Sequence, residues 1–387
     1  MKIALITPTY LPARRANTIQ VMKMAQAFTN LGHQVRVIVP GMASIGQKEE
    51  LHWEQLAFQY GLQSVFEVTW LPVRAHMRRY DFGYLAVSAA RKWEADLVYT
   101  RLPQAAVIAA WKRMETIYEI HDIPQGTVGP LLFRSYLKAP GACRMVTLTQ
   151  ALKDEILQIY GFPGSPESML VALDGVDLVR YRDIPNPVEA RRLLNADCNL
   201  NMDEERFTIG YTGHLYSGRG VALMLEMAER LPGLTFILVG GEREDVTNLR
   251  LSVESRNLKN IILTGFVPNA ALHRYQAACD VLLMPYQRKV AGSSGGDISK
   301  YLSPMKLFEY MACGRPILSS DLPVFREVLN ERNSILITPD DIDGWVDNIE
   351  ELRSDPDTRT ELANQAKMDV KQYTWKARAE RILSGLA

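Results

Sequence analysis

The sequence predicts an α/β protein made of two doubly wound domains, each a parallel sheet covered by helices, that face each other across a cleft. Short apolar runs without polar alternation recur along the chain, and helical patterns separate them, which is typical of buried parallel strands. The series occurs twice, because a polar segment that opens with Ile184-Pro-Asn-Pro interrupts it. We expect a first domain over residues 1–182, a linker over 183–205, a second domain over 206–370 and a final segment over 371–387.

In the first domain, an apolar run is followed by a helical pattern and then by a second apolar run, which predicts a strand, helix, strand unit. The apolar positions of that helix are Val21, Met24, Ala25, Phe28 and Leu31. The strands predicted for this domain are Met1–Pro8, Gln34–Pro40, Asp96–Tyr99, Thr116–Ile120, Met145–Thr149 and Met169–Leu173.

The second domain repeats this organisation after the polar segment. A helix is predicted at Val221–Arg230, directly after the first strand of the series. The strands predicted for it are Phe207–Thr212, Leu234–Val239, Asn260–Leu263, Asp280–Met284, Pro316–Ser319 and Ser334–Ile337. In open α/β sheets, ligands bind beyond the carboxyl ends of the strands, so we expect the site in the cleft between the two domains.

The composition of the 387 residues narrows the class of protein. Lys and Arg total 44, as do Asp and Glu, so the zero formal charge argues against nucleic acid as a partner. The four cysteines have no paired short spacing, which indicates reduced thiols of a cytoplasmic protein. The same spacing matches no zinc-binding motif. No signal peptide is expected at Met1, and the charge-free stretch Gln55–Phe66 is far shorter than the ~20 residues that span a bilayer.

A helix start in the second half of the chain gives the strongest local signal. In the segment Tyr301–Pro316, Ser303 is a favoured N-cap and Pro304 a favoured first helical residue. The pattern therefore predicts a helix that begins there and ends at Gly314.

The first turn of this helix carries groups that suit an anion. The amides of Met305, Lys306 and Leu307 would be available to it, and the Lys306 cation is disfavoured by the helix dipole unless an anion is bound. Glu309 lies on the same face one turn deeper, where a carboxylate can accept hydrogen bonds from a ribose diol. The alternative is an ordinary helix with a local ion pair between Lys306 and Glu309.

The loop Gly210–Gly220 is a second candidate phosphate site. Gly213, Gly218 and Gly220 permit close backbone approach, and Arg219 places another cation before a helix. The loop matches neither of the common phosphate-binding glycine motifs, so alone it is weakly specific.

The third signal is His121, which ends a buried strand in Tyr118-Glu-Ile-His-Asp-Ile-Pro. At the carboxyl end of a sheet, a histidine can donate to a sugar hydroxyl or to a leaving phosphate oxygen. A purely structural histidine is the alternative.

The first half of the chain is basic, with 19 Lys and Arg against 15 Asp and Glu in residues 1–180, a net of +4. Within it, Arg74–Trp93 combines five basic residues with four aromatic ones, against the single acid Asp81. Such a surface could contact anionic lipid headgroups, while the alternative is an ordinary solvated helix face.

Several motifs together make the chain similar to glycosyltransferase family 4, the retaining enzymes with two Rossmann-like domains known as the GT-B fold. The resemblance covers nearly the whole length. The matching segments are Pro8–Gln20, Leu31-Gly-His-Gln-Val, His121-Asp122, Asp174-Gly-Val-Asp, the loop around Gly213, Gly265-Phe-Val-Pro and Tyr373-Thr-Trp.

The resemblance implies transfer of a hexose from a nucleotide-diphosphate sugar with retention of the anomeric configuration. It implies that Arg219, Lys306 and the amides of Met305 to Leu307 bind the diphosphate, that Glu309 holds the ribose, and that His121 contacts the donor sugar. The remaining implied positions are Gly213, His214, Phe266, Val267 and Tyr301 on the donor side, with Phe266 and Val267 flanking the base, and Asn17 and Asp122 on the acceptor side. The last helix, about Tyr373–Leu386, would cross back to the first domain.

Two positions depart from the family pattern. Of the family's two glutamates, the first is replaced by Tyr301, and a usual arginine is replaced by His214. Because histidine is mostly neutral at pH 7, Arg219 and Lys306 would carry more of the charge.

The mechanism we expect uses a departing phosphate oxygen as the base, while the acceptor attacks from the same face, so no protein nucleophile and no metal are needed. Asp341-Ile-Asp343 and Asp355-Pro-Asp357 spell the triplet of metal-dependent sugar transferases, but we interpret them as helix-start residues. A sugar-nucleotide 2-epimerase and a non-catalytic sugar-binding protein are the competing interpretations. A dinucleotide oxidoreductase is disfavoured because no matching glycine motif follows a strand.

UDP is the nucleotide we expect by frequency within the family, ahead of GDP. The acceptor would be a glycan or a lipid-linked molecule in surface polysaccharide or glycolipid synthesis. We expect a cytoplasmic enzyme with peripheral membrane contact through Arg74–Trp93, and a glycine-rich loop at Ala291–Asp297 that closes over the donor.

Overall fold

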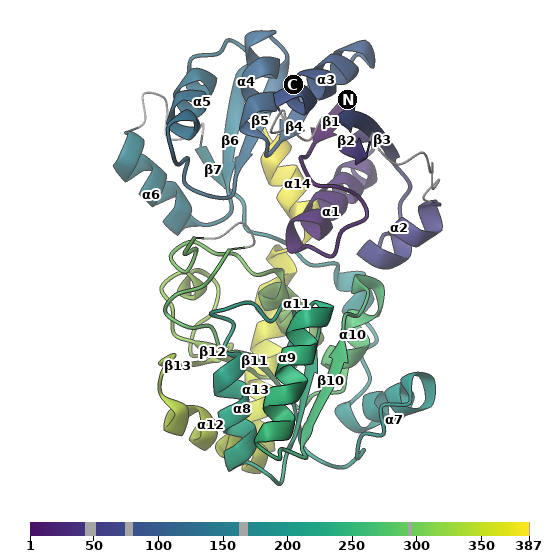
Figure 1. The fold of residues 1–387 in the computed structure, drawn as a ribbon, viewed down its shortest axis with the longest axis vertical. Coiled ribbons are helices and arrows are strands. Elements are labelled where there is room, and N and C mark those ends of the chain that lie inside the picture. The colour runs from purple at the N-terminus through teal and green to yellow at the C-terminus, as the bar shows by residue number, and fades with distance from the viewer. Residues whose placement is uncertain (43–51, 74–79, 162–168, 293–295, 387) are drawn as a thin grey trace. The chain divides into compact units, whose positions relative to one another are not determined.

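The computed structural model describes residues 1–387 except 43–51, 74–79, 162–168, 293–295 and 387 (Figure 1). The chain forms two compact units. Unit 1 consists of Met1–Asp174 together with Trp375–Ala387, and unit 2 of Gly175–Thr374. The two connections between the units run beside each other, because the Val176 amide donates to the Tyr373 carbonyl at 2.9 Å.

Unit 1 is built on a seven-stranded sheet with the order β3-β2-β1-β4-β5-β6-β7, in which all neighbours are parallel. Residues Ile3 to Ile6 of the first strand, which lies inside the sheet, are at most 1% exposed, so the apolar run forms a strand with helices over both faces (Figure 1). The strands are β1 (Lys2–Ile6), β2 (Gln34–Met42), β3 (Glu67–Val73), β4 (Leu97–Thr100), β5 (Glu115–Ile120), β6 (Ala142–Thr147) and β7 (Met169–Val171).

The helices of unit 1 include the last helix of the chain, α14, which packs against α1. One face of the sheet is covered by small and aromatic side chains of α3 and α4, among them Phe82, Ala86, Ala105 and Ala109, all fully buried. The helices are α1 (Ala16–Asn30), α2 (Trp53–Tyr60), α3 (Tyr80–Lys92), α4 (Pro103–Trp111), α5 (Val128–Leu137), α6 (Gln150–Tyr160) and α14 (Trp375–Leu383).

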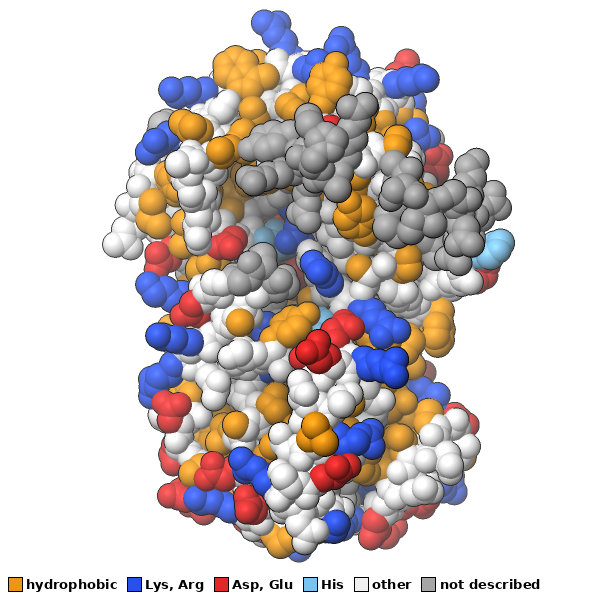
Figure 2. Space-filling model, viewed as in Figure 1, with side chains coloured by type: hydrophobic (Ala, Val, Ile, Leu, Met, Phe, Trp, Pro, Cys, Tyr) orange, Lys and Arg blue, Asp and Glu red, His pale blue; other side chains and the backbone are white. Residues whose placement is uncertain are grey.

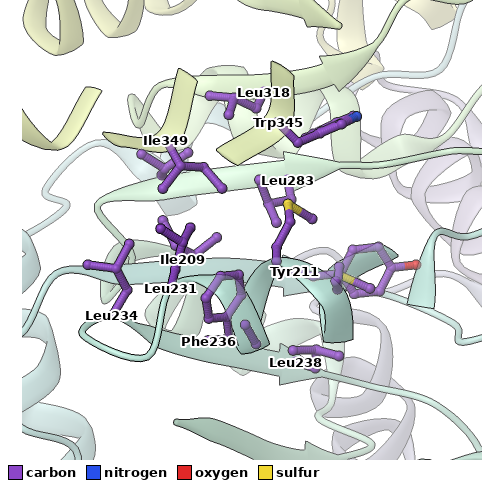
Figure 3. Packing of buried hydrophobic residues seen from close by; sticks show 14 of the residues in the cluster. Ile209, Tyr211, Leu231, Leu234, Phe236, Leu238, Leu283, Leu318, Trp345 and Ile349 are labelled. Carbon is purple, nitrogen blue, oxygen red and sulfur yellow. The ribbon is translucent and has the colours of Figure 1, made fainter. Parts of the chain in front are cut away.

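Unit 2 has a six-stranded sheet with the order β10-β9-β8-β11-β12-β13, again with parallel neighbours throughout. Its core gathers Ile209, Phe236, Leu283 and Leu318 from four strands and Trp345 from a covering helix (Figure 3). The strands are β8 (Thr208–Thr212), β9 (Thr235–Val239), β10 (Ile261–Gly265), β11 (Val281–Met284), β12 (Ile317–Ser320) and β13 (Ile335–Ile337).

In unit 2, α8 to α11 alternate with the strands, whereas α7 precedes β8 and both α12 and α13 follow β13. The α-helices are α7 (Pro187–Cys198), α8 (Val221–Arg230), α9 (Arg243–Ser255), α10 (Asn269–Ala277), α11 (Met305–Cys313), α12 (Ile342–Ser354) and α13 (Pro356–Asp369). Short 3₁₀ helices lie at η3 (Leu178–Tyr181), η4 (Phe325–Glu327) and η5 (Val370–Gln372). Among the described residues, no helix is both long enough and apolar enough to span a bilayer.

One helix and one strand were not expected from the sequence. Residues 183–205, expected to be the linker, contain α7, whose N-cap Asn186 accepts from the Glu189 amide at 3.0 Å, and the segment belongs to unit 2. The edge strand β3 was missed; none of its residues is fully buried, and Pro72 within it is unusual for a strand.

Candidate functional site

Helix α11 begins one residue later than expected. Pro304 is its N-cap and Met305 its first residue, so the prediction of Ser303 as the N-cap is wrong. The Leu307 amide donates to the Pro304 carbonyl at 3.0 Å, which makes it unavailable to a ligand. The amides of Met305 and Lys306 are the ones in this first turn that donate to no carbonyl within the described part of the chain.

The Lys306 ammonium lies among aromatic rings and another cation. Its Nζ is 3.6 Å from the centre of the Tyr211 ring and 5.4 Å from the centre of the Tyr286 ring. The Cζ atom of Arg219 is 4.9 Å from the centre of the same Tyr286 ring. Nζ is buried and has no hydrogen-bond partner in the described residues. Burial and the charge of Arg219 lower the pKa of Lys306 well below its ordinary value, although Glu309 opposes them. This buried amino group without a hydrogen-bond partner is the strongest single indication of an anion site, because a bound anion would stabilise its charged form.

Gly213 creates the space that the Lys306 head group occupies. A Cβ at this position would lie 2.8 Å from Nζ, and the backbone φ of +134° is in the region that glycine favours. At Gly220, the N-cap of α8, a Cβ would collide with the Pro285 carbonyl. The glycines thus let the loop, the cation and the neighbouring strand end approach one another closely.

His214 lies in the same loop, as expected. Its ring stacks on Tyr216 with centroids 4.6 Å apart and planes at 6°, and its carbonyl accepts from the Tyr211 hydroxyl at 2.6 Å. These contacts fix the position of His214 in the loop that precedes α8.

Glu309 is held by two side-chain amides that the sequence did not reveal. Asn269 Nδ2 donates to one carboxylate oxygen at 3.3 Å, and Gln276 Nε2 donates to the other at 3.1 Å. Arg180 donates to Asn269 Oδ1 at 2.7 Å and Tyr181 donates to Gln276 Oε1 at 2.8 Å, so both amide NH₂ groups must point to Glu309. Each oxygen retains acceptor capacity. The ion pair between Lys306 and Glu309, which was the alternative to an anion site, is not formed within 4.0 Å among the described ion pairs.

The other donor-side candidates also lie in unit 2. Phe266 and Val267 follow the end of β10 and are half-buried, while Tyr301, at the position of the family's first glutamate, is 5% exposed. The loop Ala291–Asp297 lies partly outside the described residues, and its ends are joined by a bridge between Ala291 and Asp297.

His121 is in unit 1, immediately after β5, and its Nε2 is 2.5 Å from Glu119 Oε1. Burial and the charge of Arg101 lower the pKa of His121 to about 4, against the opposing effect of Glu119. Burial would raise the pKa of Glu119, but Arg378 and His121 outweigh it and lower the pKa to about 2. At pH 7, therefore, Glu119 is an anion and His121 is neutral, with its proton on Nε2.

This arrangement limits what His121 can offer to a substrate. A neutral imidazole whose N–H already donates to Glu119 offers only a lone pair, at Nδ1, to a substrate. His121 can therefore accept a hydrogen bond from a hydroxyl, but it cannot donate one to a phosphate oxygen while this pair is intact.

The acceptor-side candidates have local partners in unit 1. Asn17 Nδ2 donates to Thr9 Oγ1 at 3.4 Å, and Asp122 Oδ1 accepts from the Ile123 amide at 2.8 Å. All donor-side candidates belong to unit 2, whereas His121, Asn17 and Asp122 belong to unit 1.

The two aspartate triplets act at helix starts. Asp341 caps α12 by accepting from the Gly344 amide at 3.0 Å, and Asp355 caps α13 by accepting from the amides of Asp357 and Thr358 at 3.0 Å. No cluster of three metal-ligating side chains occurs among the described residues.

Two parallel α/β units, one with paired cations beside a glycine-rich turn, define a glycosyltransferase of the GT-B fold class. The model for glycosyl transferases group 1 matches residues 206–355, and the model for glycosyltransferase family 4 matches residues 18–180. The chain belongs to glycosyltransferase family 4.

Relatives and solved structures agree with this assignment. An uncharacterized glycosyltransferase of Methanocaldococcus jannaschii is 22% identical over 97% of this chain and 95% of its own length. The phosphatidyl-myo-inositol mannosyltransferase of Mycolicibacterium smegmatis is 20% identical over 99% of this chain and 92% of its own. The structure of HepE from Anabaena with UDP and glucose covers 100% of both chains with a TM-score of 0.73 and 18% identity.

Proposed function

We propose that this glycosyltransferase moves a hexose from UDP to a hydroxyl group of a glycan or lipid-linked acceptor, with retention of the anomeric configuration. The observation that carries the proposal is the buried Lys306 ammonium without a hydrogen-bond partner, next to Arg219. A diphosphate placed there would supply the missing acceptors for both cations and for the amides of Met305 and Lys306. Complexes of HepE with UDP and with UDP-glucose support UDP as the nucleotide.

In the reaction that we propose, the bond from the anomeric carbon to the phosphate oxygen breaks and the acceptor oxygen bonds to the same face of that carbon. The acceptor proton passes to the departing phosphate oxygen. Lys306, Arg219 and the α11 amides stabilise the charge that develops on the leaving diphosphate, which is electrostatic catalysis by fixed groups. The Nδ1 atom of His121 accepts from a sugar hydroxyl, and Glu309 accepts from the ribose.

Thermal shift with UDP, GDP, ADP and their sugars tests the nucleotide. A ligand at about 100 times its Kd stabilises the folded state by about 2.7 kcal/mol, so the correct nucleotide should give the largest rise in Tm. No shift with any nucleotide would contradict the proposal.

Turnover tests the role of Arg219. Arg219→Ala should lower kcat/KM by at least ~100-fold, because it removes charge stabilisation of the leaving group. Arg353→Ala is the matched control, since Arg353 forms an exposed ion pair with Glu350 on the surface of the same unit. Equal turnover of both variants would refute the assignment of Arg219. Activity that persists in EDTA is expected from a mechanism without a metal.

The acceptor that we propose is lipid-linked or lies at a membrane surface. The names of two relatives, the phosphatidyl-myo-inositol mannosyltransferase and an alpha-galactosylglucosyldiacylglycerol synthase of Streptococcus pneumoniae, support lipid acceptors. Helices α3, α4 and α5 of unit 1 pack side by side and expose Tyr84, Trp111 and Leu131, with Lys112 5.8 Å from the centre of the Tyr84 ring. Basic and hydrophobic side chains also neighbour one another at the upper end of unit 1 in Figure 2. Residues 74–79 of the expected membrane-binding segment lie outside the described residues.

Co-sedimentation with vesicles tests this surface. Binding to vesicles that contain anionic lipid, but not to vesicles of neutral lipid alone, is expected, and Trp111→Ala should weaken it. Leu251→Ala removes an equally exposed apolar side chain from unit 2 and should have no effect. A cytoplasmic enzyme that binds the inner face of the membrane peripherally would fit both results.

A further inference from the structure

Three side chains from separate elements converge on the buried carboxylate of Glu119, which is 1% exposed. Gln20 of α1 and His121 after β5 both hydrogen-bond to Oε1, and Arg378 of α14 lies 3.1 Å from Oε2. The cluster belongs entirely to unit 1. Oε1 accepts both hydrogen bonds, whereas Oε2 has no hydrogen-bond partner among the described residues and is compensated by the charge of Arg378. A buried anion requires such compensation, so the cluster keeps Glu119 ionised.

Arg378 is itself fixed in one position. It is 4% exposed, and its Nε donates to the carbonyls of Ala172 and Leu173 at 3.2 and 3.0 Å. A guanidinium NH also donates to the Tyr99 hydroxyl at 3.3 Å. The last helix of the chain therefore places a rigid cation against the oxygen of Glu119 that His121 does not contact.

The position of the proton on His121 follows from this geometry. Glu119 is ionised and can only accept, so Nε2 must donate. Without the carboxylate, either nitrogen of a neutral imidazole could carry the proton, and Nδ1 would be a donor in the other tautomer.

We propose that Glu119 and Arg378 are positioning residues that hold His121 in the tautomer with the proton on Nε2, so that Nδ1 accepts a hydrogen bond from a substrate hydroxyl. The inference rests on the proposed function for the identity of the substrate, and it deepens that function in one respect. It specifies that the group recognised by His121 is a hydroxyl donor rather than a phosphate or carboxylate oxygen.

Nuclear magnetic resonance of ¹⁵N-histidine-labelled full-length protein tests the tautomer without any ligand. The protein has six histidines, and the His121 signals are assigned by their disappearance in His121→Asn. At pH 7, we expect the neutral form of His121 with the proton on Nε2. A signal from the other tautomer, or from the doubly protonated ring, would overturn the proposal.

Two variants test the roles of the partners. In Glu119→Gln, the amide NH₂ can donate to Nε2, so the proton should move to Nδ1. Arg378→Lys retains the charge but not the multiple hydrogen bonds, and it should give a mixture of tautomers. This variant keeps the test available if Glu119→Gln does not fold. An unchanged tautomer in the folded variants would refute the positioning role.

Arg144→Gln is the matched control. Arg144 also binds the last helix, through the carbonyls of Ile382 at 2.5 Å and Ser384 at 2.8 Å, but it does not contact Glu119 or His121. Loosening the helix there should leave the tautomer unchanged. A change equal to that in Arg378→Lys would show that the effect is only structural and would overturn the proposal.

Kinetics separate this inference from the proposed function. With the donor found in the thermal-shift panel, Glu119→Gln should lower kcat roughly 10- to 100-fold, as expected for one lost hydrogen bond to a reacting substrate, with KM for the donor changed little. If the tautomer changes in Glu119→Gln but kcat does not, the tautomer has no role in catalysis, and this inference is overturned while the proposed function stands. Absence of nucleotide binding in the unmodified protein instead overturns the proposed function, while the tautomer result stands.

Discussion

At the scale of the residue, the burial of Lys306 links its protonation to the stability of the protein. Lys306 has an ammonium group that no described acceptor neutralises, and two aromatic ring faces compensate only part of the cost of its burial. Its pKa is lowered well below the ordinary value, first by burial and then by Arg219. Because the folded state disfavours the proton, the unfolded state binds more protons as the pH falls below the ordinary lysine pKa.

The first prediction concerns protons at Lys306. The free energy of unfolding of the ligand-free protein should rise as the pH increases toward ~10.4, and Lys306→Met should lack this rise. UDP should restore the charged form of Lys306, so its binding should be accompanied by proton uptake. Above pH 7 the phosphates of UDP are already ionised, so this uptake occurs at Lys306. Calorimetry in buffers of different ionisation enthalpy measures the uptake. Equal proton uptake by Lys306→Met would contradict this account.

Gly213 gives the second prediction at this scale. Gly213→Ala should destabilise unit 2 by about 1–3 kcal/mol through backbone strain, and it should also weaken UDP binding, because its Cβ displaces the Lys306 head group. Denaturant unfolding and UDP titration measure the two effects. Gly233→Ala, in the same unit, meets no atom within 4 Å and serves as the control, with a stability change within ~0.5 kcal/mol.

At the scale of the element, helices α10 and α11 act together. Glu309 comes from α11, but the amides that orient it come from α10, and Tyr181 of η3 orients one of those amides in turn. The carboxylate is therefore oriented by two further elements, α10 and η3, and not by its own helix alone. Since each oxygen already accepts one hydrogen bond, the remaining lone pairs are directed and can bind a pair of neighbouring hydroxyls.

The third prediction tests that orientation. The unmodified protein should bind UDP about 10- to 100-fold more tightly than 2′,3′-dideoxy-UDP, as expected for hydrogen bonds to a charged group. Gln276→Leu should remove most of this preference, while Arg274→Gln should retain it, because Arg274 lies on the same helix as Gln276 but pairs with Asp197 of α7. Titration calorimetry measures all the affinities. If the unmodified protein does not distinguish the two nucleotides, Glu309 does not bind the ribose.

At the scale of the whole molecule, two buried groups of unit 1 have opposite effects on stability. Burial, partly offset by Arg378, raises the pKa of Asp174 to about 7, so its contribution to stability is lost as the pH rises from 3.8 through 7. The pKa of His121 is lowered to about 4, so its contribution is lost as the pH falls from 6.5 through 4. Between about pH 4 and 6.5, the two slopes have opposite signs and nearly cancel.

The fourth prediction separates these two pH dependences of the free energy of unfolding. Relative to the unmodified protein, Asp174→Asn should gain stability as the pH rises from 4 to 6.5, whereas His121→Gln should lose stability over the same range. Each slope corresponds to about one proton, or ~1.4 kcal/mol per pH unit at most. Denaturant unfolding at a series of pH values measures both. Parallel curves for all three proteins would show that neither group is perturbed.

Many elements of both sheets could be predicted from the sequence, because their strands are continuous apolar runs that a parallel sheet buries on both faces. The edge strand β3 and helix α7 could not, since an exposed edge has no such run and a polar helix resembles a linker. For the site, Lys306, Arg219 and Gly213 could be found because a cation or a glycine at a helix start is a local signal. Gln276 and Asn269 could not be found, because side-chain amides are common and only their contacts with Glu309 assign them to the site.

The sequence by itself determined the two α/β units, the glycine-rich turn and the cations beside it, since strand periodicity and helix-start chemistry depend on residues a few positions apart. Only the tertiary structure decided which nitrogen of His121 carries the proton and how Glu309 is aimed. Both depend on partners remote in sequence, such as Arg378 for Glu119 and Gln276 for Glu309. The physical reason is that a buried polar group must find its hydrogen-bond partners wherever packing brings them, and packing is set by the whole unit rather than by neighbours along the chain.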